Sequence, residues 1–169
     1  MNALTTGGVG LTECTIRELR AEENFLLDDF LYEAIFIPPN VEPPPRAITQ
    51  KPELKIYVED FGADEHDNAF VAVIDGKIIG AVWSRIMNDY GHIDDQTPSL
   101  AIAVRNQYRN RGLGTRLMKR LLECLKSKRY RRVSLSVQKI NPARRFYERL
   151  GFKIFDERGD ELILTKELR

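Results

Sequence analysis

A short basic stretch with two glycines, residues 109–115, is the part of the sequence best suited to bind an anion. It reads Arg109-Asn110-Arg111-Gly112-Leu113-Gly114-Thr115, and it joins a β-type run to an amphipathic helical run. The first N–H groups of a helix have no partners within the helix, and the helix dipole adds positive charge there. Glycines let a ligand approach the backbone closely. The stretch therefore predicts a cradle for a phosphate or diphosphate group.

Two well-known phosphate loops and an ordinary turn compete with this interpretation. A Walker A loop is excluded because Gly-Lys-Ser/Thr is missing at the required spacing. A dinucleotide fingerprint is excluded because Leu117 stands where its third glycine would be. Taken alone, the turn is also consistent with a plain strand-to-helix connection in which glycine only eases the bend.

A second stretch, residues 141–152, supports the anion-binding interpretation. It reads Asn141-Pro142-Ala143-Arg144-Arg145-Phe146-Tyr147-Glu148-Arg149-Leu150-Gly151-Phe152. Arg-x-x-Gly-x-Gly opening a helix, followed by Asn-x-x-x-x-x-Tyr-x-x-x-Gly-Phe, resembles the Gcn5-related N-acetyltransferase (GNAT) superfamily. The strong part of the resemblance runs from about Ser99 to Phe152, and a weaker part runs from about Thr15 to Thr165.

The resemblance implies a mixed sheet in which two neighbouring strands, here Ser99–Val104 and Val133–Val137, splay apart. The pantetheine arm of acetyl-CoA would pair with the first strand, and a backbone N–H near Ile102, Ala103 or Val104 would bind the acetyl carbonyl oxygen. The pyrophosphate would bind the turn, whose implied ligands are Arg109, Asn110, Arg111, Gly112, Leu113, Gly114 and Thr115. Asn141 would bond to pantetheine or cap its helix. Acetyl-CoA is thus the expected cosubstrate, and no metal is expected.

Tyr147 is the residue that the resemblance implies as general acid. A phenol with a pKa of about 10 can protonate the CoA thiolate as it leaves the tetrahedral intermediate. The alternative is that Tyr147, beside Phe146, only packs against the sheet. The general base has no assignment, because no acid lies within Leu100–Val104, although some members of the family use a Glu or Asp through water.

The expected acceptor is a primary amine, on a small molecule or a protein, that arrives as a cation. The loop Asn88–Pro98 carries Asp94 and Asp95 and no Lys or Arg, and a predicted helix at Ala21–Ile35 is also acidic. Two acidic walls would attract a cation. The aromatic residues expected to add an apolar or cation–π surface are Phe36 and Tyr57. The alternative is that the aspartates only cap turns.

Composition predicts a globular chain with no overall bias toward nucleic acid. The chain has 169 residues and a net charge of +1, which predicts one domain over residues 13–169 after a flexible tail at residues 1–12. No apolar run is long enough to span a bilayer and no signal peptide is recognisable, so a cytoplasmic location is expected. The two cysteines, Cys14 and Cys124, suit neither a disulfide framework nor a Cys/His metal site.

Together with the resemblance, the order of elements implies a mixed α/β fold with a central, mostly antiparallel sheet of six or seven strands and about four helices. Strands are expected at Thr15–Leu19, Ala69–Ile74, Lys77–Met87, Ser99–Val104, Val133–Val137, Phe152–Asp156 and Glu161–Thr165. Helices are expected at Ala21–Ile35, Pro52–Asp60, after Gly112 and at Asn141–Leu150. The first of them is expected to bury Phe25, Leu26, Phe30, Leu31 and Ala34 in part.

Two rival functions stay open at this point. A non-catalytic acyl-CoA-binding sensor would use the same fold. An RNA-binding domain would use the basic stretch Arg105–Arg132, where eleven Lys and Arg residues accompany one acid, but only Tyr108 and Tyr130 are available for stacking. The oligomeric state, including a homodimer, also stays open.

Overall fold

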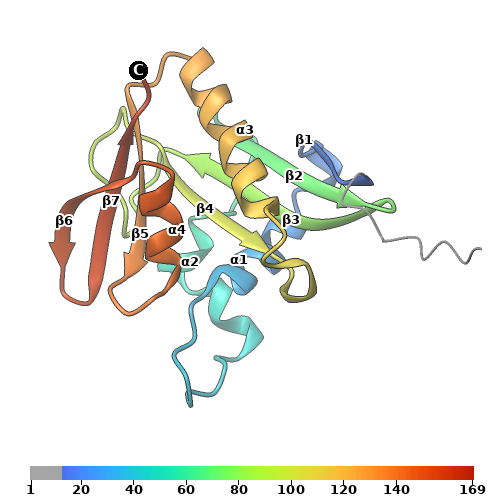
Figure 1. Cartoon of the computed structure of the whole chain (residues 1–169), viewed down its shortest axis with the longest axis horizontal. Helices are drawn as coiled ribbons and strands as arrows, with labels where there is room; N and C mark the ends of the chain where they lie inside the picture. Colours follow the sequence, from blue (N-terminus) through green and yellow to red (C-terminus); the bar gives the residue numbers. More distant parts are fainter. Residues whose placement is uncertain (1–12) are drawn as a thin grey trace, which may run out of the picture.

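The computed structural model of the chain describes residues 13–169, and the predicted tail at residues 1–12 lies outside the described residues (Figure 1). The strands are β1 (Thr15–Glu18), β2 (Asn68–Ile74), β3 (Lys77–Arg85), β4 (Ser99–Val104), β5 (Arg132–Gln138), β6 (Lys153–Arg158) and β7 (Glu161–Glu167). The α-helices are α1 (Leu26–Ala34), α2 (Pro52–Lys55), α3 (Leu113–Ser127) and α4 (Ala143–Arg149). Short 3-10 helices are η2 (Ala21–Glu23), η3 (Arg46–Gln50) and η4 (Asn106–Tyr108).

The seven strands form one sheet in the order β1-β2-β3-β4-β5-β7-β6. Neighbouring strands are antiparallel except β4 and β5, which are parallel. The β2–β3 hairpin turns at Asp75-Gly76, where both residues have positive φ angles of 51° and 73°. The mixed, mostly antiparallel sheet expected from the sequence is therefore confirmed.

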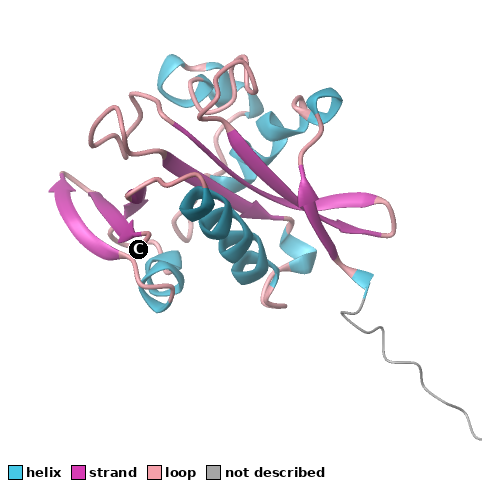
Figure 2. Cartoon of the chain, turned by 90° about the horizontal axis from the view of Figure 1, so that it is seen from above, coloured by secondary structure: helices cyan, strands magenta, loops and turns pink. Residues whose placement is uncertain are grey.

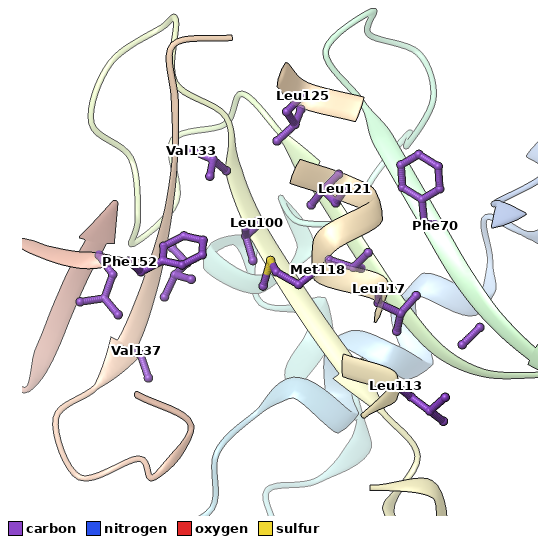
Figure 3. Close-up of a cluster of buried hydrophobic side chains, with 14 of the residues drawn as sticks. Phe70, Leu100, Leu113, Leu117, Met118, Leu121, Leu125, Val133, Val137 and Phe152 are labelled. Atoms are coloured by element: carbon purple, nitrogen blue, oxygen red, sulfur yellow. The ribbon is translucent and has the colours of Figure 1, made fainter. Parts of the chain in front are cut away.

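Helix α3 packs on one face of the sheet and supplies the main core. Its leucines at every fourth position, Leu113, Leu117, Leu121 and Leu125, are at most 2% exposed. They contact apolar side chains of β2, β4 and β5, as the close-up in Figure 3 shows. The apolar stripe predicted from the leucine repeat is confirmed, and its burial fixes the start of α3 beside the end of β4.

The N-terminal helices cover the opposite face (Figure 2). Leu27, Phe30 and Leu31 of α1 are buried against Trp83 of β3 and the small side chains of β4. Phe25 is 72% exposed, so the prediction that it is partly buried was wrong. The reason is geometric, because Phe25 lies on the side of the helix away from the three buried positions.

The helix predicted over Pro52–Asp60 is shorter, since α2 ends at Lys55. Side chains of β3 bind the carbonyl groups that follow it. Trp83 Nε1 donates to the carbonyl oxygen of Tyr57 at 3.0 Å, and Arg85 donates to those of Ile56 and Glu59 at 3.1 and 2.8 Å. Tertiary hydrogen bonds therefore hold this segment as turns, with Tyr57 buried.

Candidate active site

A fork between β4 and β5 is the framework of the candidate site. The two parallel strands share a single residue pair, Ser99 with Ser134. Beyond that pair they diverge toward their C-terminal ends (Figure 1). In the described chain, the β5-facing edge of β4 therefore has no strand partner at Ile102, Ala103 and Val104. A linear ligand with amide groups can pair with such an edge.

The loop after β3 ties the two strands together at the closed end of the fork. Asp89 accepts hydrogen bonds from the Ser99 hydroxyl at 2.7 Å and from the Tyr57 hydroxyl at 2.8 Å. Ser134 Oγ donates to the carbonyl oxygen of Gly91 at 2.8 Å. The start of each strand is thus anchored to the same loop, which fixes the point where the strands begin to separate.

The glycine turn, residues 109–115, follows β4 after the short 3-10 helix η4 and continues into the first turn of α3. Asn110 and Gly112 both adopt left-handed backbone conformations, with φ angles of 62° and 77°, and Gly112 is the N-cap residue of α3. The first N–H group to be bonded back into the turn is that of Arg116, at 3.1 Å from the carbonyl oxygen of Gly112. The N–H groups of residues 113–115 accordingly have no partner among the described residues and can bind an anion.

Gly114 brings the turn, the fork and α4 together. A Cβ atom at Gly114 would lie 3.5 Å from Cζ of Phe146 and 4.0 Å from Cδ1 of Ile102. Phe146 belongs to α4 and Ile102 to β4, so the three stretches predicted to bind the cofactor meet at this one position. The two motifs, which are about thirty residues apart in the sequence, therefore lie next to each other in the fold.

Tyr147 lies next to Phe146 on α4 and presents a hydroxyl group without a protein partner in the described residues. Its ring packs at centroid distances of 5.3 Å from Phe146 and 6.0 Å from Phe152. Burial raises the pKa of Tyr147 to about 12. The phenol is therefore protonated throughout the neutral range and can donate a proton or a hydrogen bond.

Two other predicted cofactor residues already have protein contacts. The Oδ1 atom of Asn141 accepts the N–H of Ala143 at 2.9 Å, which is the predicted capping role and leaves the amide donors of Asn141 available. Arg109 Nε donates to the carbonyl oxygen of Val104 at 2.9 Å, and its guanidinium lies 3.5 Å from Glu33 of α1. Arg109 thus links the turn both to β4 and to the helix on the other face.

The acidic walls predicted from the sequence are largely neutralised. Asp28 and Asp29 of α1 both pair with Arg46, and Glu33 pairs with Arg105 and Arg109. Acids on a helix that lies beside arginines of the same fold form ion pairs, so α1 is not a row of unpaired charges, and its attraction for a cation stays a prediction.

The aromatic surface predicted at Tyr57 was also wrong, because this side chain is 7% exposed and its hydroxyl binds Asp89. Phe36, predicted beside it, is half-buried. The sequence pattern contains no signal that would pair Tyr57 with Asp89, 32 residues further along the chain.

The two loop aspartates predicted to meet the acceptor differ in their surroundings. Asp94 binds Arg132 at 2.7 Å and accepts the N–H of Gln96 at 2.9 Å. Asp95 is exposed, with 96% of its side-chain area accessible. An acceptor role for Asp94 stays a prediction. Its ion pair with Arg132 argues against that role, because the arginine already neutralises the carboxylate.

Replacing Asp94 by asparagine should slightly lower the free energy of unfolding, and only at pH values above about 4. Arg132 is the main reason that the pKa of Asp94 falls from 3.8 to about 2. A carboxyl group whose pKa is lowered by folding stabilises the folded state above its unfolded pKa, and this stabilisation disappears as the pH falls from about 4 to about 2. Because the pair is solvated, we expect a loss below about 1 kcal/mol at pH 7.

Urea unfolding between pH 2 and pH 7 measures this effect. Asp95→Asn is the matched control, and its unfolding midpoint should follow the wild-type protein at every pH. A loss for Asp94→Asn that persists unchanged at pH 2 would show that the ion pair with Arg132 is not its cause.

Within residues 13–169 no group of three or more His, Cys, Asp or Glu side chains is arranged to hold a metal ion. Both cysteines carry free thiols, and Cys14 is buried. The helices of the described part of the chain are all too short or too polar to cross a membrane.

Sequence comparisons identify a family and two curated relatives. A model of the family described as "Acetyltransferase (GNAT) family" matches residues 31–152. An N-alpha-acetyltransferase of Sulfurisphaera tokodaii is 36% identical over 93 residues, which are 50% of this chain and 55% of that protein. An N-alpha-acetyltransferase of Saccharolobus solfataricus is 33% identical with the same coverage. The chain spans about half the length of these curated relatives.

Solved structures with the same fold cover nearly the whole chain. The PaiA N-acetyltransferase of Thermoplasma acidophilum, solved in complex with coenzyme A, has a TM-score of 0.69 at 20% identity, covering 91% of this chain and 98% of that one. The ribosomal-protein-S18-alanine N-acetyltransferase of Escherichia coli has a TM-score of 0.62 at 18% identity, covering 92% and 94%. At these identities the likeness concerns the fold.

Proposed function

We propose that this chain, which belongs to the acetyltransferase (GNAT) family, transfers the acetyl group of acetyl-CoA to a primary amine by direct attack. The observation that carries the proposal is the close approach of the Gly114 backbone to Phe146 and Ile102, where a Cβ atom would lie only 3.5 and 4.0 Å from them, and which unites three features at one place. These features are the unpaired edge of β4, the free N–H groups at the start of α3, and the α4 segment that holds Tyr147. Each meets a separate chemical need of an acyl-CoA thioester.

Acetyl-CoA would occupy the fork with its diphosphate on the turn. The N–H groups of residues 111–115, with Arg109 and Asn110 beside them, would bind the diphosphate. The amides of pantetheine would pair with β4 at residues 102–104, and the amide of Asn141 would bind the same arm from the other side. The coenzyme A complex of the Thermoplasma relative supports a ligand of this class.

In the proposed reaction, the neutral amine attacks the thioester carbon and a C–N bond forms. A backbone N–H of β4 stabilises the oxyanion of the tetrahedral intermediate. The C–S bond then breaks, the Tyr147 hydroxyl gives its proton to the sulfur, and the resulting phenolate takes the surplus proton from the acetylated nitrogen. The products are an N-acetylated amine and free CoA thiol, and Tyr147 ends the cycle protonated.

The acceptor we propose is an amine, on a small molecule or a protein, that arrives as an ammonium ion. Two relatives are named N-alpha-acetyltransferases, so a peptide α-amino group belongs among the candidates. Lysine side chains, polyamines and aminoglycosides offer the same functional group. Asp95 pairs with no Lys or Arg in the described chain, although it lies 3.7 Å from Nε2 of His92, and its 96% exposure makes it the more accessible of the two predicted loop aspartates for such a cation.

Release of CoA thiol from acetyl-CoA, followed across a panel of these amines, tests the proposal. We expect acceptor-dependent release with at least one class and N-acetylation of that acceptor in the mass spectrum. Acetyl-CoA that binds but is not turned over with any amine would indicate a sensor module. Failure to bind acetyl-CoA would remove the cofactor assignment.

A further inference from the structure

Glu161 occupies a position at the open end of the fork that the reaction outlined above does not yet use. It is the first residue of β7 and pairs with Gln138, the last residue of β5. Leu162 and Leu164 belong to the core beneath α3. Because side chains alternate along a strand, Glu161 faces the opposite side of the sheet, which also carries Ser134 and Ser136 of β5.

Three segments far apart in the sequence converge around this carboxylate. The pKa of Tyr90, in the loop after β3, is raised by burial and then by the charges of Glu53 and Glu161. The pKa of Tyr57, in the segment after α2, is raised well above its ordinary value by burial, by Asp89 and also by Glu161. The charge of Glu161 therefore acts on both hydroxyl groups, and Glu161 shares its face of the sheet with Ser134 and Ser136 of β5.

Within residues 13–169, Glu161 is in no ion pair and accepts no side-chain hydrogen bond. Its neighbour across the hairpin, Arg158, forms no ion pair with it, and instead binds Asp156 at 3.0 Å and the carbonyl oxygens of Tyr90 and His92 at 3.3 and 3.2 Å. Glu157 pairs with Lys139 at 3.1 Å. Glu161 is thus the half-buried carboxylate left free beside the fork.

The environment of Glu161 makes its carboxylate a better proton acceptor than an exposed one. Burial, with a further contribution from the negative charge of Asp160, raises its pKa above the ordinary value of 4.5. A carboxylate whose pKa is raised accepts a proton more readily. The charged and titratable groups that face it from neighbouring elements are Tyr57, Tyr90, Asp160, Lys139 and Arg158.

From this placement we infer that Glu161 is the general base of the acetyl transfer, an inference that rests on the proposed function. Tyr147 packs with Phe146 and Phe152 on the face covered by α3, whereas Glu161 lies on the face covered by α1. Acid and base thus act from opposite sides of the gap. The acceptor enters between Tyr90 and Glu161, and the thiolate leaves toward Tyr147.

The proton balance of the step is simple. The ammonium ion of the acceptor gives one proton to the Glu161 carboxylate, which passes it to solvent. The neutral amine then attacks the thioester, and the remaining transfers run through Tyr147 as described above. One proton is released for each amine acetylated.

The pH dependence of kcat/KM for the acceptor tests Glu161 in the full chain. For the wild-type protein we expect an acidic limb set by Glu161. In Glu161→Gln we expect kcat/KM to fall about 10- to 100-fold at neutral pH. The decline of kcat/KM at acidic pH should disappear, and the affinity for CoA should stay unchanged. The deficit should shrink as the pH approaches the pKa of the amine, about 10.4 for a lysine, because the acceptor then loses its proton unaided.

Two variants on the same hairpin control the experiment. Asp160→Asn removes a neighbouring negative charge and should move the acidic limb to lower pH. Glu157→Gln should leave the whole profile unchanged. A Glu161→Gln enzyme that keeps the acidic limb, or that is slower by one constant factor at all pH values, would overturn the assignment. If the wild-type protein acetylates no amine, the proposed function and the assignment of Glu161 both fail.

Discussion

Replacing Tyr147 by phenylalanine is expected to lower kcat by about 10²–10⁴ with little change in the affinity for CoA, as for the loss of a general acid. The substitution removes only the hydroxyl group, which makes no hydrogen bond to another described residue. The ring keeps its contacts with Phe146 and Phe152. Steady-state kinetics with saturating acetyl-CoA, together with calorimetry for CoA, measures the two quantities separately.

The pKa of Tyr147 adds a second readout to this experiment. Because burial raises it to about 12, the wild-type rate should show no alkaline decline from loss of the acid until the pH approaches that value. Tyr130→Phe, at the far end of α3, is the matched control and should leave kcat unchanged. Wild-type turnover by Tyr147→Phe under conditions where chemistry limits the rate would make Tyr147 a packing residue.

Replacing Gly114 by aspartate is expected to weaken CoA binding at least about 100-fold while the protein stays folded. A carboxylate there would stand against the diphosphate, and two unit charges about 4 Å apart near a protein surface repel by about 4 kcal/mol. An acid in the first turn of a helix is favourable for the helix itself, so the loss of binding should not come from unfolding. Calorimetry with CoA measures the affinity, and circular dichroism checks the fold.

Gly114→Ala is the control for side-chain volume at this position. Its Cβ would lie 3.5 Å from Phe146, an ordinary contact distance, and alanine favours the helix. We therefore expect stability to be preserved and CoA binding to weaken far less than in the aspartate variant. An affinity for CoA that is unchanged in the folded Gly114→Asp protein would show that the diphosphate does not bind at this turn.

The parts of the fold that a local pattern specifies could be predicted from the sequence. The leucine repeat of α3 follows the helical period, and Asp75-Gly76 matches the turn of a two-residue hairpin. The fork needed more than local patterns, because only the resemblance implied that β4 and β5 separate. The structure then showed the single shared pair, Ser99 with Ser134.

The candidate site was less predictable wherever it depends on contacts between distant residues. Asp94 and Glu33 look like free acids in the sequence, but each is paired with an arginine that lies far away in the chain. Glu161 was not singled out by any motif, because its position follows from the pairing of β7 with β5. The sequence shows which residues are charged. The electrostatic field in a site also depends on which of these charges form ion pairs, and the sequence does not show the pairs.

The fork also has a consequence for the protein without its ligand. A strand edge that lacks a partner is a template for pairing with another chain, and proteins usually cover or blunt such edges. Here the uncovered edge of β4 lies in the interior of the sheet, where charges or a proline would also block the proposed ligand site. Whatever binds in the gap therefore completes the sheet as a missing strand would, and shields this edge from association with other molecules.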